Sequence, residues 1–241
     1  MNKTKVLGVD FVNSSVAESV EYALQLMDNH QTKYILAANS EMMHEISRNK
    51  QLRSAARSAS IVLPEGSGVV FASSILGTPI RNRISAFDFA AALMARMSEK
   101  RMTAYILGDD LYNIELSRDT MAARFPDLNI QYSDIYDFSS DIELVDYVNE
   151  IEPDLMLVCI GEDKQERWIY RHKDELNVGL IMGFSEELDV YAGISERAPK
   201  RWRDSGFEWL YWIIKEPKRL VRTLKRSWIV FAAMWRRIFG Y

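Results

Sequence analysis

The sequence predicts a three-layer α/β domain with a mostly parallel, Rossmann-like sheet, followed by a basic helical appendage. Short apolar runs rich in branched residues alternate with segments of helical spacing through residues 1–199, as in parallel sheets that carry helices on both faces. Residues 200–241 then hold five of the six tryptophans and eleven Lys and Arg against three acids. This change near Pro199 predicts a core domain over residues 1–199 and an appendage over residues 200–241.

Seven short apolar runs have the composition of buried strands, and seven longer segments between them have the apolar spacing of helices. The predicted strands are Val6–Val9, Tyr34–Ala38, Ile61–Leu63, Ala104–Leu107, Asn129–Tyr132, Leu155–Ile160 and Val178–Met182. The predicted helices are Val16–Met27, Met42–Arg57, Val69–Leu76, Phe87–Ser98, Ile114–Arg124, Ile142–Ile151 and Gln165–Lys173. Because the two sets alternate, we expect most neighbouring strands to run parallel.

Bulk properties favour a cytoplasmic protein. Hydrophobic residues make up 48% of the 241 residues, which is enough for one well-packed core. The single cysteine, Cys159, has no intrachain partner, which argues against a secreted domain held by disulfides. The first residues are too polar for a signal peptide, and no run approaches the ~20 apolar residues of a membrane span. We therefore expect any membrane contact to be peripheral.

Polar residues follow most of the predicted strands. Ligands of open α/β sheets bind at the carboxyl ends of the strands, so these residues are the first candidates for a site. They are Asn39-Ser40, Pro64-Glu65-Gly66-Ser67-Gly68, Gly108-Asp109-Asp110, Gly161 to Glu166, and Gly183 with Asp189 and Gly193 beyond it. Such a ring suits a pocket for a polar small molecule. The alternative for each loop is that its Gly and Asx residues only cap helices.

The segment Pro64 to Gly68 predicts a turn that opens a helix. The free N–H groups and the positive end of the helix dipole favour an anion there. Glu65 could act as a general base beside that anion. The alternative is a solvated loop glutamate.

Several other kinds of site lack their sequence signatures. The chain has neither the G-x-G-x-x-G nor the G-x-x-x-x-G-K-[ST] fingerprint, which argues against a dehydrogenase or a P-loop phosphotransferase. His30, His44 and His172 lack the spacing of a zinc site or a Ser-His-Asp triad. Asp109-Asp110 have no third carboxylate at useful spacing. We expect no metal and no cofactor.

The appendage has the pattern of one amphipathic helix that starts at Pro217, a favourable first helical residue. Its apolar stripe holds Leu220, Val221, Leu224, Trp228, Phe231, Trp235, Ile238 and Phe239. The opposite face holds Lys218, Arg219, Arg222, Lys225, Arg226, Arg236 and Arg237. Trp and Arg both suit the headgroup layer, so we expect this helix to lie on an anionic membrane. The alternative is an ordinary surface helix that packs on the core.

A series of motifs then stands in a fixed order along nearly the whole chain. The most specific are Lys164-Gln165-Glu166-Arg167-Trp168, Arg197-Ala198-Pro199, Glu208-Trp209-Leu210-Tyr211 and Glu216-Pro217-Lys218-Arg219. Others are Asn39-Ser40-Glu41, Val62 to Val70, Arg83, Asp88, Ile106-Leu107-Gly108, Pro153-Asp154, Gly161, Asp189 and Ala192-Gly193. In these motifs and their order the chain resembles the WecG/TagA/CpsF glycosyltransferases, glycosyltransferase family 26.

The resemblance implies an inverting, metal-independent transfer of a sugar of the N-acetylmannosamine type in cell-surface polysaccharide synthesis. The implied partners are a UDP-sugar donor, an acceptor amino sugar linked to undecaprenyl diphosphate, and an anionic membrane surface. The protein would then be cytoplasmic and peripheral on the inner face of the cell membrane. We expect no nucleic-acid partner, and a homo-oligomer is left open.

The resemblance also implies roles for single residues. Glu65 would be the catalytic base, and Asn39 would orient sugar or nucleotide beside it. Arg83 would offset the charge of the departing diphosphate. The residues expected to bind the donor are Arg83, Asp88, Gly108, Gly161, Gln165, Glu166 and Asp189. Those expected to hold the lipid diphosphate or the membrane are Arg219, Arg222, Arg226, Trp228 and Trp235.

The departures from the family pattern cluster in the predicted pocket. Glu65 stands where the family has Asp, and a shift of the acid by about 1 Å can cost on the order of a hundredfold in rate. The other departures are Ala37, Ser85-Ala86, Glu162-Asp163 and Met182-Gly183-Phe184-Ser185. They indicate either a different donor or weakened activity. A membrane-bound scaffold subunit of polysaccharide assembly is therefore the alternative function.

Overall fold

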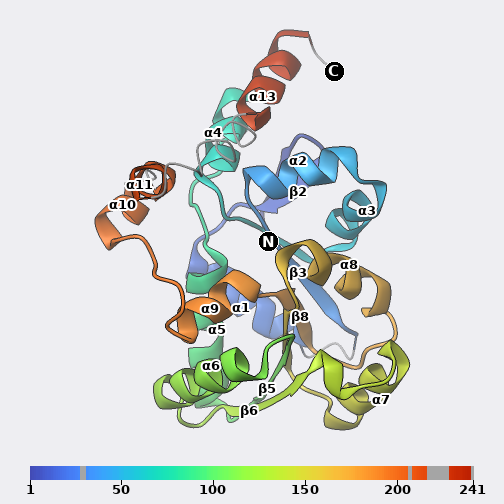
Figure 1. Ribbon diagram of the computed structural model, residues 1–241. Helices are drawn as coiled ribbons and strands as arrows, with labels where there is room; N and C mark the ends of the chain where they lie inside the picture. Colours follow the sequence, from blue (N-terminus) through green and yellow to red (C-terminus); the bar gives the residue numbers. More distant parts are fainter. Residues whose placement is uncertain (28–30, 206–207, 216–227, 240–241) are drawn as a thin grey trace.

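The computed structural model describes residues 1–27, 31–205, 208–215 and 228–239, and its centre is a six-stranded sheet (Figure 1). All pairs of neighbouring strands run parallel, in the order β4-β3-β8-β7-β5-β6. The strands are β3 (Lys33–Ala38), β4 (Ile61–Pro64), β5 (Thr103–Gly108), β6 (Asn129–Asp134), β7 (Leu155–Cys159) and β8 (Leu180–Gly183). The predicted parallel α/β sheet is therefore confirmed.

Helices cover both faces of the sheet, and its strands are therefore buried on both sides. In β3, Ile35 belongs to the core on one face, whereas Tyr34 and Leu36 belong to the core on the other. The Ile35 face is covered by α1 (Val16–Met27), α5 (Ala86–Glu99), α6 (Leu111–Arg124) and α9 (Ser185–Tyr191). The Leu36 face is covered by α2 (Ser40–Arg48), α3 (Lys50–Ser58), α4 (Ser67–Ile75), α7 (Asp141–Ile151) and α8 (Glu162–His172).

The prediction of a strand over Val6–Val9 was wrong. The chain instead forms an antiparallel hairpin of β1 (Lys3–Val6) and β2 (Val9–Val12), which is separate from the main sheet. Leu7 and Gly8 both have positive φ, 48° and 90°, as the favoured two-residue hairpin turns require. This turn reverses the chain in the middle of the predicted strand.

The predicted helix Met42–Arg57 was also wrong in its continuity. Asn49 is extended, with φ −106° and ψ 119°, and separates α2 from α3. Its side-chain oxygen accepts from the N–H groups of Gln51 and Leu52 and so caps α3. The structure further contains η1 (Ile135–Asp137), α9, α10 (Lys200–Asp204) and α11 (Glu208–Lys215), which are too short for a periodic pattern to predict.

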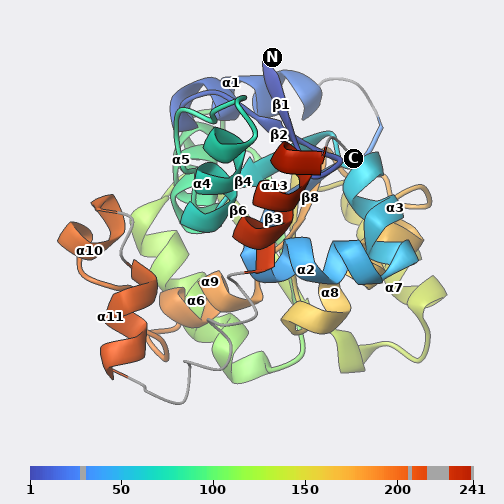
Figure 2. The same cartoon turned by 90° about the horizontal axis from the view of Figure 1, so that it is seen from above.

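The last described helix, α13 (Trp228–Phe239), lies beside α4 at the edge of the molecule (Figures 1 and 2). Ile229 and Ala233 are fully buried, and Trp228 is half-buried with its ring edge against His44, 5.3 Å between ring centroids. The predicted helix is therefore present over residues 228–239, and one of its faces packs on the core. The rest of that prediction, with Arg219, Arg222 and Arg226, lies outside the described residues.

Candidate active site

At the carboxyl ends of the strands the helices leave the sheet in opposite directions. After β3 and β7 the chain passes to α2 and α8 on one face, whereas after β8 and β5 it passes to α9 and α6 on the other. Ligands of open α/β sheets bind at such switch points. Asn39, Glu65, Gly161 and Gln165 all follow strands at this edge.

Glu65 directly follows β4 at this edge of the sheet. Burial raises the pKa of Glu65 to about 7, although its carboxylate accepts the Ala86 N–H at 3.0 Å, and the nearby Glu186 also raises it. The residue nevertheless keeps partial exposure to solvent. An acid with a pKa near neutrality and some exposure to solvent can act as a general base.

Arg83 connects the Glu65 loop to the appendage. Its Nη1 donates to the Glu65 carbonyl at 3.3 Å and to Glu208 Oε2 of α11 at 3.1 Å. The two side chains of this ion pair are both about one-quarter exposed, 23% for Arg83 and 29% for Glu208. The guanidinium expected to meet a diphosphate therefore already holds an anion from the same chain.

Glu166 is a second acid at this edge, and it is nearly inaccessible, with 4% exposure. Burial raises its pKa to about 7, although Tyr34 Oη and the Gln165 amide both donate to its carboxylate, and the charge of Glu65 raises the pKa further. Gly183 leaves the room for this arrangement, because a side chain there would collide with both Gln165 and Glu166.

Ser185 fixes the other end of the Gln165 side chain. Its hydroxyl donates to Gln165 Oε1 at 2.7 Å and accepts the N–H of Gly161 at 3.0 Å. Gly161 has φ +91°, and no atom lies within 4 Å of the place a Cβ would take. Ser185, one of the departures from the family pattern, thus connects the loops after β7 and β8.

Asn39 caps α2, because its side-chain oxygen accepts from the N–H groups of Glu41 and Met42 at 2.9 and 3.0 Å. Its backbone also lies against Gly66, where a Cβ would approach Asn39 Cα to 3.1 Å. The loop of Asn39 and the loop of Glu65 are therefore in contact. The side-chain oxygen of Asn39 therefore caps a helix, which was the alternative to a ligand-binding role.

Asp88 and Gly108 have structural surroundings. Asp88 accepts from Arg197 Nη1 at 2.8 Å, and Arg197 also lies over the Phe87 ring, 4.1 Å from its centroid. Burial would raise the pKa of Asp88, but Arg197, with Arg203 and Arg83, lowers it. A Cβ on Gly108 would clash with Ile114 of α6. The two residues thus anchor the chain after α9 and allow close packing of α6.

Asp189 lies in α9, at an acidic end of the edge. Burial raises its pKa, and the charges of Glu186, Asp109 and Asp110 raise it further. Among the residues that the structure describes, no three His, Cys, Asp or Glu side chains are arranged to hold a metal ion.

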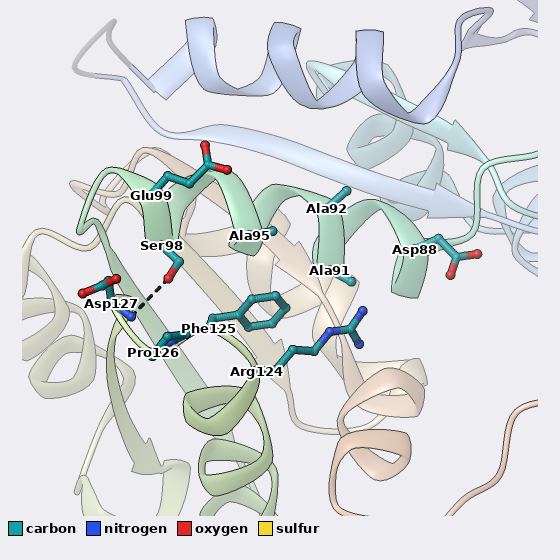
Figure 3. A pocket seen from close by; sticks show the side chains of 10 residues that line it. All are labelled: Asp88, Ala91, Ala92, Ala95, Ser98, Glu99, Arg124, Phe125, Pro126 and Asp127. Carbon is teal, nitrogen blue, oxygen red and sulfur yellow. Dashed lines mark hydrogen bonds between the residues drawn. The ribbon is translucent and has the colours of Figure 1, made fainter.

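A cavity of about 580 Å³ lies between α5 and the end of α6 (Figure 3). Its lining is Asp88, Ala91, Ala92, Ala95, Ser98, Glu99, Arg124, Phe125, Pro126 and Asp127. Of these only Asp88 is a predicted site residue, and its carboxylate is engaged by Arg197. Glu65 is not among the residues that line this cavity.

Sequence reasoning missed Tyr34, Ser185 and Glu208 as site residues. Tyr34 reads as part of a buried strand, and its contact with Glu166 spans 132 residues. Ser185 and Glu208 did carry signals, the first as a departure from the family pattern and the second in the Glu208-Trp209-Leu210 motif. Neither signal identified the partner.

The fold is a parallel α/β domain in which polar loops meet at the carboxyl ends of the strands. Residues 4–241 match the sequence profile of the glycosyl transferase WecG/TagA/CpsF family. The chain belongs to this family and is a sugar-transferring enzyme.

Curated relatives agree with this assignment. The N-acetylglucosaminyldiphosphoundecaprenol N-acetyl-beta-D-mannosaminyltransferase of Staphylococcus aureus strain MW2 is 28% identical over 222 residues, 91% of this chain and 87% of that protein. The protein of the same name from Bacillus spizizenii is 28% identical over 218 residues, 90% of this chain and 84% of that protein.

Proposed function

We propose that the protein transfers an N-acetylmannosamine-type sugar from a UDP donor to an amino sugar on undecaprenyl diphosphate, with inversion and without a metal. The position of Glu65 carries this proposal: a partly exposed acid with a pKa near 7 stands at the carboxyl ends of the strands. The names of the relatives supply the acceptor and the sugar. The donor, the stereochemistry and the metal independence come from the family resemblance.

In the proposed step, the acceptor hydroxyl oxygen attacks the anomeric carbon of the donor on the face opposite UDP. Glu65 takes the hydroxyl proton as the new C–O bond forms. The bond from the anomeric carbon to the phosphate oxygen breaks, and UDP leaves with the electron pair, which inverts the anomeric centre. Arg83 would offset the growing charge on the diphosphate once Glu208 gives way.

A lipid-linked acceptor requires the site at Glu65 to work at a membrane surface. None of the described helices is long and apolar enough to cross a bilayer. We place the protein on the inner face of the cell membrane, held there by the appendage. Arg219, Arg222 and Arg226 would pair with lipid phosphates, and Trp235 on the exposed side of α13 would enter the headgroup layer.

The test is to incubate the protein with undecaprenyl-diphosphate-linked N-acetylglucosamine and a panel of UDP-sugars. We expect a product with one added sugar from UDP-N-acetylmannosamine or a close relative, of inverted anomeric configuration by NMR. Binding of a donor without turnover of any panel member would favour the scaffold subunit instead.

A further inference from the structure

We propose that Ser185 is a positioning residue that acts on the general base, Glu65, through two other side chains. Ser185 orients the amide of Gln165, and this amide holds the carboxylate of Glu166 near the base. The inference rests on the proposed role of Glu65, and it adds a residue that controls the base from the start of α9.

The hydrogen bonds at Ser185 run in one direction. The Gly161 backbone N–H donates to the Ser185 hydroxyl oxygen at 3.0 Å, and a backbone N–H can only donate. The hydroxyl proton then goes to a second partner, which is Gln165 Oε1 at 2.7 Å. The Ser185 backbone N–H donates to the same oxygen at 3.3 Å. Both groups of Ser185 that face Gln165 are thus donors, and they require an oxygen there.

The other end of the Gln165 amide meets an acceptor. Its nitrogen donates to the Glu166 carboxylate, whose Oε2 is hydrogen-bonded to the Tyr34 hydroxyl. A reversed amide would place its oxygen against this carboxylate and its nitrogen against the donors of Ser185. Gln165 and Glu166 are only 8% and 4% exposed, so water has little access to replace a lost partner. The orientation of the amide is therefore set from both ends, and Ser185 supplies one of them.

The sheet brings this pair of side chains close to the base. A Cβ on Gly183, the last residue of β8, would collide with both Gln165 and Glu166, so the pair lies against the end of that strand. Strand β8 neighbours β3, and β3 neighbours β4, which ends at Pro64, one residue before Glu65. Two strand spacings are about 10 Å, and charges at this distance interact when burial limits the screening by water.

The two acids act on each other. The charge of Glu65 raises the pKa of Glu166, and by reciprocity the charge of Glu166 raises the pKa of Glu65. The hydrogen bond from Gln165 has the opposite effect on Glu166, because it stabilises the ionised carboxylate and lowers the pKa. Loss of the Ser185 hydroxyl should free the amide, so that Glu166 keeps its proton to higher pH. Glu65 then loses a neighbouring charge and ionises at lower pH.

The experiment is a pH titration of the full chain by ¹³C NMR, with the carboxyl carbon of the Glu side chains labelled. Glu65→Gln and Glu166→Gln identify the two signals by their loss. In Ser185→Ala we expect the midpoint of Glu166 to move up by about half a pH unit. The midpoint of Glu65 should move down by less than this. Unchanged midpoints in a Ser185→Ala variant that is folded by circular dichroism would overturn the proposal.

Two variants separate the orientation of the amide from a general loss of packing. Ser185→Thr keeps the hydroxyl and should retain the parent midpoints. Ser117→Ala is the matched control, because the buried hydroxyl of Ser117 donates at 2.9 Å to the carbonyl of Leu188 in the same helix, α9. This control should lower stability to urea and leave both midpoints unchanged. Shifts in Ser117→Ala as large as those in Ser185→Ala would show that loosening α9 is sufficient, and would refute the role of Ser185.

A double variant tests the path through Glu166. If Ser185 acts along this path, adding Ser185→Ala to Glu166→Gln leaves the Glu65 midpoint where Glu166→Gln alone puts it. A further shift in the double variant would mean that Ser185 acts through another charge, and would overturn the proposal. The other charged side chains that act on Glu65 are Glu186, which directly follows Ser185, Arg83 and Glu208.

No sugar substrate enters these titrations, so a failed transfer reaction and a failed role for Ser185 can be told apart. If Glu65 is the base, kcat/KM of Ser185→Ala should rise with pH at the lowered midpoint of its Glu65 signal. If the signals shift as expected but the rate profile stays that of the parent, the role of Ser185 stands and Glu65 is excluded as the base.

Discussion

Two acids at the same sheet edge have a pKa near 7 for the same reason, yet their surroundings differ. Burial raises the pKa of both Glu65 and Glu166. Glu65 lies in a loop, keeps partial exposure and accepts one backbone N–H from Ala86. Glu166 is 4% exposed and is held by side chains, Tyr34 on one side and Gln165 on the other.

The difference separates an acid that can exchange a proton with a substrate from one that positions its neighbours. A general base must reach the proton that it takes, and of these two acids only Glu65 keeps partial exposure to solvent. Glu166 joins β3 to α8 through Tyr34, and its charge acts on Glu65 across the edge. A raised pKa alone therefore does not identify the catalytic acid.

The largest effect should come from Glu65→Gln. We expect turnover to fall by roughly 10²–10⁴, with donor affinity within a few-fold, since a general base acts in the transition state. Steady-state kinetics measure turnover, and calorimetry of UDP binding measures affinity for the nucleotide part of the donor. In the parent enzyme kcat/KM should rise with pH through about 7, where Glu65 loses its proton. Turnover of Glu65→Gln at the parent rate would exclude Glu65 as the base.

Glu65→Asp tests whether the surroundings of Glu65 are adapted to the longer acid. Because the Glu65 carboxylate reaches the Ala86 N–H, we expect Asp to be slower, by up to about a hundredfold for a 1 Å displacement. The same kinetic assay measures this rate. A faster Asp variant would indicate that the pocket has declined from the family arrangement.

For Glu166 we expect an effect on stability. Its pKa is raised from 4.5 to about 7 on folding, so the native state binds this proton more tightly than the unfolded state. The stability contribution is full below pH 4.5 and is lost as pH rises through 7, a change on the order of 3 kcal/mol. Urea unfolding across this range should show less loss for Glu166→Gln than for the parent.

The control for this measurement is Glu150→Gln, an exposed acid of α7. It should keep the pH dependence of the parent. If Glu166→Gln also kept it, the proton would reside on another group, and the contrast between the two acids would fail.

A smaller effect is expected from Glu208→Gln. Removing this charge frees Arg83 for the donor diphosphate, and a partly exposed pair contributes about 0.5–1 kcal/mol, so UDP should bind roughly two- to fivefold tighter. Calorimetry measures the affinity for UDP. Arg83→Ala is the comparison variant, and it should bind UDP more weakly than the parent. Weaker UDP binding by Glu208→Gln would mean that Glu208 belongs to the donor site.

The smallest effect, none, is expected from excess EDTA. Arg83 and backbone N–H groups would balance the phosphates in place of a divalent ion. The activity assay with and without EDTA checks this. Loss of activity, with recovery on Mg²⁺ or Mn²⁺, would return attention to Asp109 and Asp110.

Much of the fold could be predicted because strand and helix patterns are local. Six of the seven predicted strands lie in the main sheet, and their polar ends meet at one edge. The errors are also local in cause. The Leu7-Gly8 turn and the extended Asn49 each interrupt a continuous apolar pattern, which periodicity alone does not detect.

The sequence by itself determined the parallel sheet, the family, and the loop position of Glu65, because these depend on short patterns and motif order. Only the tertiary structure decided the partners of the site residues. Arg83 meets Glu208 across 125 residues, and Tyr34 meets Glu166 across 132. The structure likewise divided α13 into a buried and an exposed side, which a single apolar stripe does not distinguish. Such pairings depend on which elements become neighbours in the packed core, and no local pattern encodes that choice.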